Sequence, residues 1–75
     1  MERGPLLKIL NEMKGTNKEL DLIIVGTSTP VEIRNVVDID DMRGGGVIRI
    51  TTRQNHIWIE AAHVALAYQV RTDGG

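Results

Sequence analysis

The feature that most constrains this fold is an alternation of apolar and polar residues that recurs between residues 31 and 60. Ile48 and Ile50, for example, flank Arg49. Successive side chains of a β-strand point to opposite faces, so a period of two predicts strands with one face in the core and the other in solvent. The segments over residues 31–39 and 56–60 follow the same rule, and the short polar turns between segments predict antiparallel pairing.

One amphipathic helix, over about residues 5–14, precedes these strands. Pro5 suits the first turn of a helix because its missing N–H needs no partner there, and Gly15 suits the left-handed position that ends one. Apolar residues recur at steps of three and four and form one stripe: Leu6, Ile9, Leu10 and Met13. A helix this short is not stable alone in water, so its stripe must pack against the strands or a partner.

The segment over residues 31–39 is long for so small a chain, and its pattern changes at the centre. Its odd positions share one face: Val31, Ile33, Val37 and Ile39. Asn35 interrupts this apolar face and Val36 interrupts the polar one, which indicates a bend or bulge there. Further runs over residues 20–25 and 64–70 complete five predicted strands. In the last run four residues are expected to share a face: Val64, Leu66, Tyr68 and Val70.

Together these elements predict a mostly β fold, in which an N-terminal α-helix is followed by a five-stranded, strongly bent antiparallel sheet that forms a small SH3-like barrel. A chain of 75 residues allows one domain over residues 1–75, with a flexible tail over residues 72–75. With one Trp, one Tyr and no Phe, the core is mostly aliphatic and thin. Small chains without a disulfide or a metal often gain stability by oligomerising.

Composition and motifs exclude several classes of function. The chain has no cysteine, which excludes a disulfide scaffold, a thiolate zinc site and a cysteine nucleophile. No segment approaches the roughly 20 apolar residues that span a bilayer, and the N-terminus lacks a signal peptide, so we expect a soluble cytoplasmic protein with no membrane partner. No motif places a nucleophile or carboxylate beside His56 or His63, so we predict that the protein is not an enzyme and uses no cofactor.

Two features near the segment over residues 40–46 are typical of a surface loop. Asp38, Asp40 and Asp41 lie within four residues, but their spacing is not that of an EF-hand, and no metal site is predicted. The glycine triplet at residues 44–46 follows no phosphate-binding pattern, because no helix follows it and no Lys-Ser or Lys-Thr pair accompanies it. We expect this loop to be the most flexible internal segment.

Three of the strand segments resemble those of the Sm-like family. Residues 31–40 are similar to the long second strand of that family, which ends near an Asp. Residues 47–52 are similar to its third strand, and residues 56–64 are similar to its fourth strand, short turn and the start of its fifth. The resemblance extends over residues 5–70 and implies an Sm-like barrel that forms a closed homo-oligomeric ring, in which the fourth and fifth strands of neighbouring copies pair.

The resemblance implies assembly more than it implies RNA binding. The family's bacterial RNA chaperone carries a Tyr-Lys-His run that lines its RNA-binding pore, whereas the matching residues here are Glu60, Ala61 and Ala62. A smaller similarity, through residues 26–29 and 46–48, is to the ring-forming tryptophan-responsive RNA-binding attenuation proteins.

Six residues are the candidates for binding. If RNA is the ligand, outward-facing basic side chains are expected to contact it: Arg34, Arg49, Arg53 and His63. Trp58 alternates with Ile57 and Ile59 and therefore points away from the core, which is typical of an interface unless the helix of the same subunit covers it. Tyr68 is the second candidate interface residue.

The ligand itself stays open. A net charge of −1 is not that of a protein that binds phosphate backbone over its whole surface, and acidic residues are interleaved with the arginines. The expected function is a homo-oligomeric, ring-forming protein with RNA as one candidate ligand. The alternative is a protein-only interaction or scaffold module with an SH3-like barrel and no nucleic-acid ligand.

Overall fold

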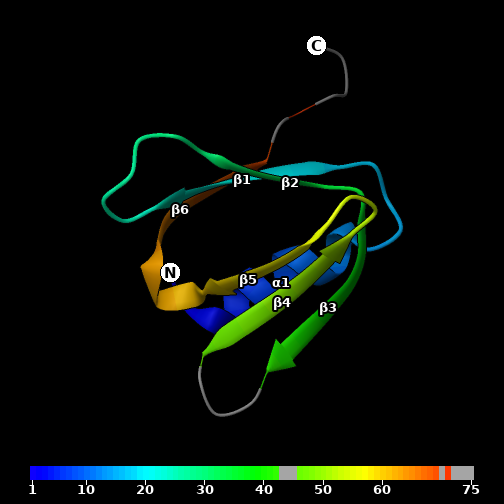
Figure 1. Cartoon of the computed structure of the whole chain (residues 1–75), viewed down its shortest axis with the longest axis horizontal. Coiled ribbons are helices and arrows are strands. Elements are labelled where there is room, and N and C mark those ends of the chain that lie inside the picture. The colour runs from blue at the N-terminus through cyan, green and yellow to red at the C-terminus, as the bar shows by residue number, and fades with distance from the viewer. Residues whose placement is uncertain (43–45, 70, 72–75) are drawn as a thin grey trace.

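One helix and six strands make up the part of the chain that the computed structural model describes, residues 1–42, 46–69 and 71 (Figure 1). The elements, in chain order, are α1 (Arg3–Met13), β1 (Glu19–Ile24), β2 (Val31–Arg34), β3 (Val36–Met42), β4 (Val47–Thr52), β5 (His56–Glu60), the 3-10 helix η1 (Ala61–His63) and β6 (Val64–Gln69). Some of the residues named in the expectations from the sequence lie outside the described part of the chain: Gly44, Gly45, Val70 and the tail over residues 72–75. Strand β3 includes Asp40 and Asp41, so the loop predicted from residue 40 begins later than expected.

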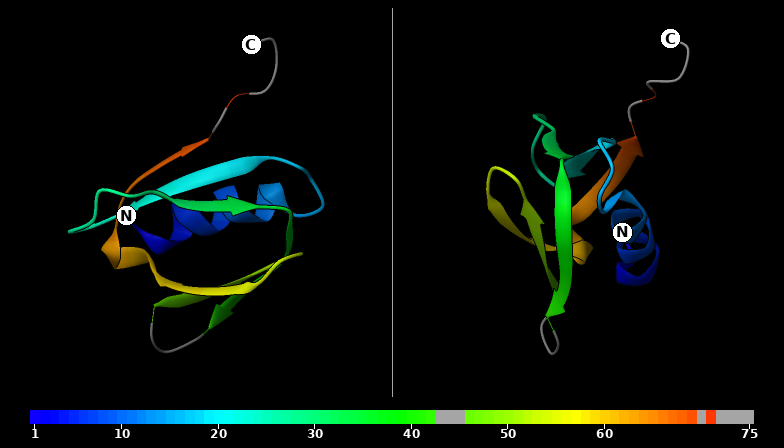
Figure 2. Two further views of the ribbon diagram at one scale, coloured as in Figure 1. Left: turned by 45° about the horizontal axis from the view of Figure 1, so that its top comes forward. Right: turned by 90° about the vertical axis from the view of Figure 1, so that its right-hand side faces the viewer.

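The strands form two three-stranded antiparallel sheets, in the orders β2-β1-β6 and β3-β4-β5 (Figure 2). This confirms the mostly β fold with one N-terminal helix. There are six described strands instead of five because the long second strand is divided at Asn35. The described strands do not close into a barrel, since β5 pairs only with β4 and β6 pairs only with β1.

Asn35 is the bend that the sequence predicted. Its φ is 56°, in the left-handed region that few residues other than glycine adopt. The register of β3 on β4 shifts between Val36 and Asp38, so Val36 is buried and Val37 is exposed. The prediction that Val37 shares the buried face of Ile33 is therefore wrong, because the bend at Asn35 reverses the alternation at Val36 and Val37. The bulge restores it at Ile39, which packs against the core.

The core lies where the helix meets both sheets. Helix α1 begins at Arg3, two residues before the predicted start, and its buried residues are Leu6, Leu10 and Met13. They join one cluster with the inward residues of the strands: Leu20, Leu22, Ile33, Val36, Ile48, Ile50, Ile59, Ala61 and Val64. In Figure 2 the helix runs along one side of the space between the two sheets. Among the described residues, no helix is long and apolar enough to span a membrane.

Strand β6 departs from the predicted alternation. The register of β1 on β6 shifts between Ile23 and Ile24, so that Ile24 lies opposite Val64 while Ile23 lies opposite Leu66. Val64 is consequently buried, whereas Leu66 and Tyr68 are exposed. The prediction that Val64 shares a face with these two residues is therefore wrong.

We predict that Asn35 is needed for its backbone conformation. Asn35→Ala should lower the free energy of unfolding by about 1 kcal/mol, because a Cβ without a polar partner is strained at positive φ. Asn35→Gly should retain or raise it, since glycine adopts this conformation without strain. Urea unfolding at one protein concentration measures both values. Equal stability of the two variants would contradict the prediction.

Candidate functional site

Four strands stand at the ends of the two sheets, β2 and β6 in one and β3 and β5 in the other, and each has one unpaired side within the described residues. Two of these end strands, β5 and β6, carry the predicted interface residues Trp58 and Tyr68. Strand β5 is bonded to β4 alone and strand β6 to β1 alone within the described residues. Such an edge presents backbone N–H and C=O groups that can pair with another chain. Apolar side chains are exposed on the same two strands: Trp58 is 57% exposed, Leu66 53% and Tyr68 43%. Both predicted interface residues therefore lie on the free-edge strands.

Trp58 points out of the sheet, and the helix does not cover it. It lies opposite Arg49 in the register of β4 and β5, and its ring is 6.0 Å from that of His56. Beside it is an open groove between β5 and the first sheet, lined by Ile24, Val31, Ile57, Trp58, Ile59, Glu60 and His63. His63 Nε2 is 3.7 Å from Glu60 Oε2 at the rim. The structure thus brings Trp58 and His63 to one groove with an apolar floor.

The arginines predicted to bind RNA do not form one patch. Arg34 lies on β2 and bonds Glu19 and Glu32, and Arg49 in β4 is 3.2 Å from Asp40. Arg53, in the turn after β4, has no carboxylate within 4.0 Å among the residues that the structure describes. Only Arg53 of the three therefore keeps its charge free for a ligand.

Arg53 lies beside the bend. Its backbone N–H donates a hydrogen bond of 3.1 Å to the carbonyl of Asn35. Together with the end of the helix and the start of β3, it lines a second groove, formed by Gly15, Thr16, Asn17, Asn35, Val36, Val37 and Arg53. This groove presents backbone, amide and guanidinium groups, which suits a polar or anionic ligand.

The acidic run of β3 is neutralised by neighbouring basic residues. Asp38 lies 3.9 Å from Lys14, Asp40 lies 3.2 Å from Arg49, and Asp41 lies 3.5 Å from Arg3. Each carboxylate has its own partner, so these residues form ion pairs with α1 and β4 and do not converge on a shared point.

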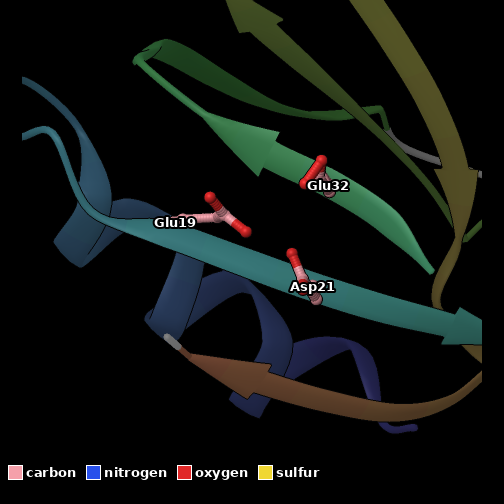
Figure 3. Close-up of side chains that lie close together, drawn as sticks. All are labelled: Glu19, Asp21 and Glu32. Atoms are coloured by element: carbon pink, nitrogen blue, oxygen red, sulfur yellow. The ribbon is translucent and has the colours of Figure 1, made fainter. Parts of the chain in front are cut away.

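A different group of acids, which the sequence analysis missed, does converge. Glu19 and Asp21 on β1 and Glu32 on β2 point toward one another on the outward side of the β2-β1-β6 sheet (Figure 3). One carboxylate oxygen from each lies within 4.8 Å of the others. Asp21 is opposite Glu32 on one side and opposite Tyr68 on the other. Nη2 of Arg34 contacts Glu19 at 2.9 Å and Glu32 at 3.3 Å.

This crowding shifts two pKa values. The hydrogen bond that the protonated Glu19 carboxyl makes with Asp21, together with desolvation, raises the pKa of Glu19 above 4.5, although Arg34 opposes the shift. Desolvation and the negative charge of Asp21 raise the pKa of Tyr68 above its ordinary value of 10.0. The hydrogen bond with Asp21 is the largest cause of the raised pKa of Glu19, and desolvation is the largest cause of the raised pKa of Tyr68.

The signal that could have identified this group is Asp21 itself. It is a charged residue in the middle of an apolar strand segment, and Glu19, two residues earlier, shares its face. Glu32 was harder to place, because its position opposite Asp21 depends on the register across the turn over residues 25–30.

No protein-family model, curated protein or solved structure matches this chain. Its function is therefore inferred from the free strand edges with their exposed apolar residues, the groove beside Arg53, and the acidic group of β1 and β2.

The raised pKa of Glu19 predicts that the contribution of this residue to stability decreases as pH rises. A carboxyl with a higher pKa in the folded chain contributes its full stabilisation below its unfolded value of 4.5, and this is lost as pH rises through the folded value. The charged and titratable groups that face it are Asp21, Glu32, Arg34 and Tyr68. Glu19→Gln lacks this titration, so the melting temperature of the variant should rise relative to that of wild type as pH increases above about 4.5.

Glu12→Gln, on the exposed side of α1, is the matched control and should follow the wild-type pH profile. Parallel melting profiles for wild type and Glu19→Gln would contradict the predicted role of Glu19.

Proposed function

We propose that this chain is a self-assembling, Sm-like protein in which β5 of one copy pairs with β6 of the next. The observation that carries this proposal is that β5 and β6, two of the four end strands, each combine an unpaired edge with exposed apolar side chains: Trp58 on β5, and Leu66 and Tyr68 on β6. Pairing satisfies edge groups that otherwise invite uncontrolled aggregation. It also removes Trp58 and Leu66 from water, which stabilises the contact by roughly 25 cal/mol for each Å² of apolar surface buried.

The two edges differ from each other, so the contact they favour is head-to-tail. A head-to-tail contact repeats from copy to copy and produces a ring if the rotation closes. The arrangement of one helix, a bent strand shared between two sheets and free edges at both ends supports the Sm-like assignment. The groove lined by Ile24, Val31 and Ile57 offers an apolar surface next to the β5 edge on which a neighbour can pack.

A charge introduced at either edge should prevent assembly. Leu66→Arg on β6 and Trp58→Arg on β5 are each expected to convert a multimer into a monomer, because a buried unpaired charge is costly. Native mass spectrometry of the purified protein measures the outcome. Val37→Arg is the matched control: it changes an equally exposed apolar residue of β3, an end strand that the proposed pairing does not use, and should leave the multimer intact.

A wild-type protein that is monomeric at every concentration would contradict the proposal, as would a multimer that persists in both edge variants. A monomer would leave a small protein-binding module as the better interpretation.

RNA is the ligand proposed for the assembled form, with Arg53 as its principal contact. Repetition around a ring would place one Arg53 groove on each subunit, so weak single contacts would add along one strand of RNA. Glu60, Ala61 and Ala62 stand where the family's bacterial chaperone has its RNA-contacting run, so the groove at the bend is the preferred site.

Arg53→Gln should weaken binding of single-stranded RNA and flatten its salt dependence. Loss of one phosphate contact reduces the slope of log affinity against log salt by about 0.7 per site. Lys8→Gln, on the exposed side of α1, removes an equal charge outside the groove and should change affinity less. Fluorescence anisotropy at several salt concentrations gives both quantities, and identical slopes for Arg53→Gln and wild type would contradict the role of Arg53.

The second candidate is a protein-only scaffold, and the paired state of Arg34 and Arg49 favours it. The two proposals differ in what accompanies the purified multimer. Copurifying RNA raises the ratio of ultraviolet absorbance at the nucleic-acid maximum to absorbance at the protein maximum, and nuclease removes it. A scaffold without RNA keeps its mass and its absorbance after nuclease treatment.

A further inference from the structure

The outward face of the β2-β1-β6 sheet carries a group of carboxylates that neither assembly nor RNA binding uses. We infer that Glu19, Asp21 and Glu32 bind a single hard divalent cation, of the Ca²⁺, Mg²⁺ or Mn²⁺ class. The inference stands on their convergence and on the burial of Asp21, and it does not depend on assembly of the chain.

The spacing of the three carboxylates fits one ion. Two oxygens that bind the same Ca²⁺ at about 2.4 Å are at most about 4.8 Å apart. One oxygen from each of the three residues satisfies this limit with respect to both others. Neighbouring strands hold them in place, since Asp21 and Glu32 are directly opposite in the register and Glu19 is two residues from Asp21 on the same strand.

Asp21 gives the second, independent indication of a ligand. It is only 7% exposed, and its Oδ1 is buried without a hydrogen-bond partner in the described structure. Thr52, the other buried polar residue described, is fully bonded: its hydroxyl accepts from the backbone N–H groups of Gln54 and Asn55 and contacts Asn55 Oδ1 at 2.8 Å. A buried carboxylate oxygen without a donor is costly, and a cation would remove that cost.

The local charge also calls for a dication. The three carboxylates carry −3 and the guanidinium of Arg34 carries +1, which leaves −2 for the four groups. Arg34 compensates only part of the negative charge of the three carboxylates. Its Nη2 contacts Glu19 and Glu32, and neither ion pair includes Asp21. A divalent cation would neutralise the remainder at the buried end.

The donor set selects the class of ion. All three ligands are carboxylate oxygens, which hard cations prefer, and neither histidine nor cysteine is present to favour zinc or copper. Glu32 is exposed, so water can complete the coordination from that side. A partly open site with three carboxylates is expected to bind with a dissociation constant on the order of 0.1–1 mM.

Titration with Mn²⁺, followed by the loss of the free-ion signal in electron paramagnetic resonance, tests the inference on the full chain. Wild type should bind one Mn²⁺ per chain in a saturable manner, and Ca²⁺ should compete. Asp21→Asn and Glu32→Gln should each weaken binding at least about tenfold, since each removes one charged ligand. Glu32 is exposed, so Glu32→Gln remains informative if Asp21→Asn fails to fold.

Two further variants distinguish binding of the cation at these three carboxylates from nonspecific attraction to acidic residues. Asp40→Asn removes an equal charge from an ion pair on the other sheet and should bind Mn²⁺ like wild type. Arg34→Gln removes the competing guanidinium and should bind Mn²⁺ more tightly. Absence of saturable binding, or equal affinity in wild type, Asp21→Asn and Glu32→Gln, would overturn the inference.

Discussion

The bend at Asn35 is the constraint on which the rest of the structure depends. Without it, residues 31–42 would form one straight strand. The strands would then make a single flat sheet, and the helix could cover only one face of it. The positive φ at Asn35 lets β2 join one sheet and β3 the other. Backbone bonds hold both sides of the bend, from Arg53 N–H to the carbonyl of Asn35 and from Gly15 N–H to the carbonyl of Val36. The end of the helix and the β4–β5 turn are thereby fixed at one point, and all three layers share a core.

The same bend divides the strands between two sheets and so leaves strand edges unpaired. A single core of aliphatic residues is enclosed, but β6 leaves an unpaired edge on one sheet and β5 leaves one on the other within the described residues. Among the described residues no further strand pairs with these edges, and a second copy of the chain is the partner that we propose for them. The groove beside Arg53 lies at the bend, and neither Arg34 nor Arg49, whose charges are held in ion pairs, is among its lining residues. Assembly and ligand binding are therefore assigned to separate parts of the fold.

The local features were predictable from the sequence because they depend on neighbouring residues. The apolar stripe of the helix, the alternation around Ile48 and Ile50, and the bend at Asn35 all follow from short-range pattern. The exposure of Leu66 did not, because it depends on a register shift at Ile23 that the alternation of β6 does not reveal.

The charged sites depend on contacts between distant segments. Arg34 appeared available for RNA because Glu19 is 15 residues away in sequence, yet the two are 2.9 Å apart across β1 and β2. The cluster around Asp21 was missed for the same reason, since it forms only when the turn over residues 25–30 sets the register. Strand identity could thus be read from the sequence, whereas the partners of each charge required the structure.

Hydrogen exchange of the backbone amides in β5 and β6 tests the proposed pairing most directly. The amides of these strands that face away from β4 and β1 have no partner within the described chain. If β5 of one copy pairs with β6 of the next, these amides should be protected at high protein concentration and should exchange faster on dilution. If they exchange as fast as exposed chain at every concentration while the inner amides stay protected, the two edges are not paired and the proposed assembly is wrong.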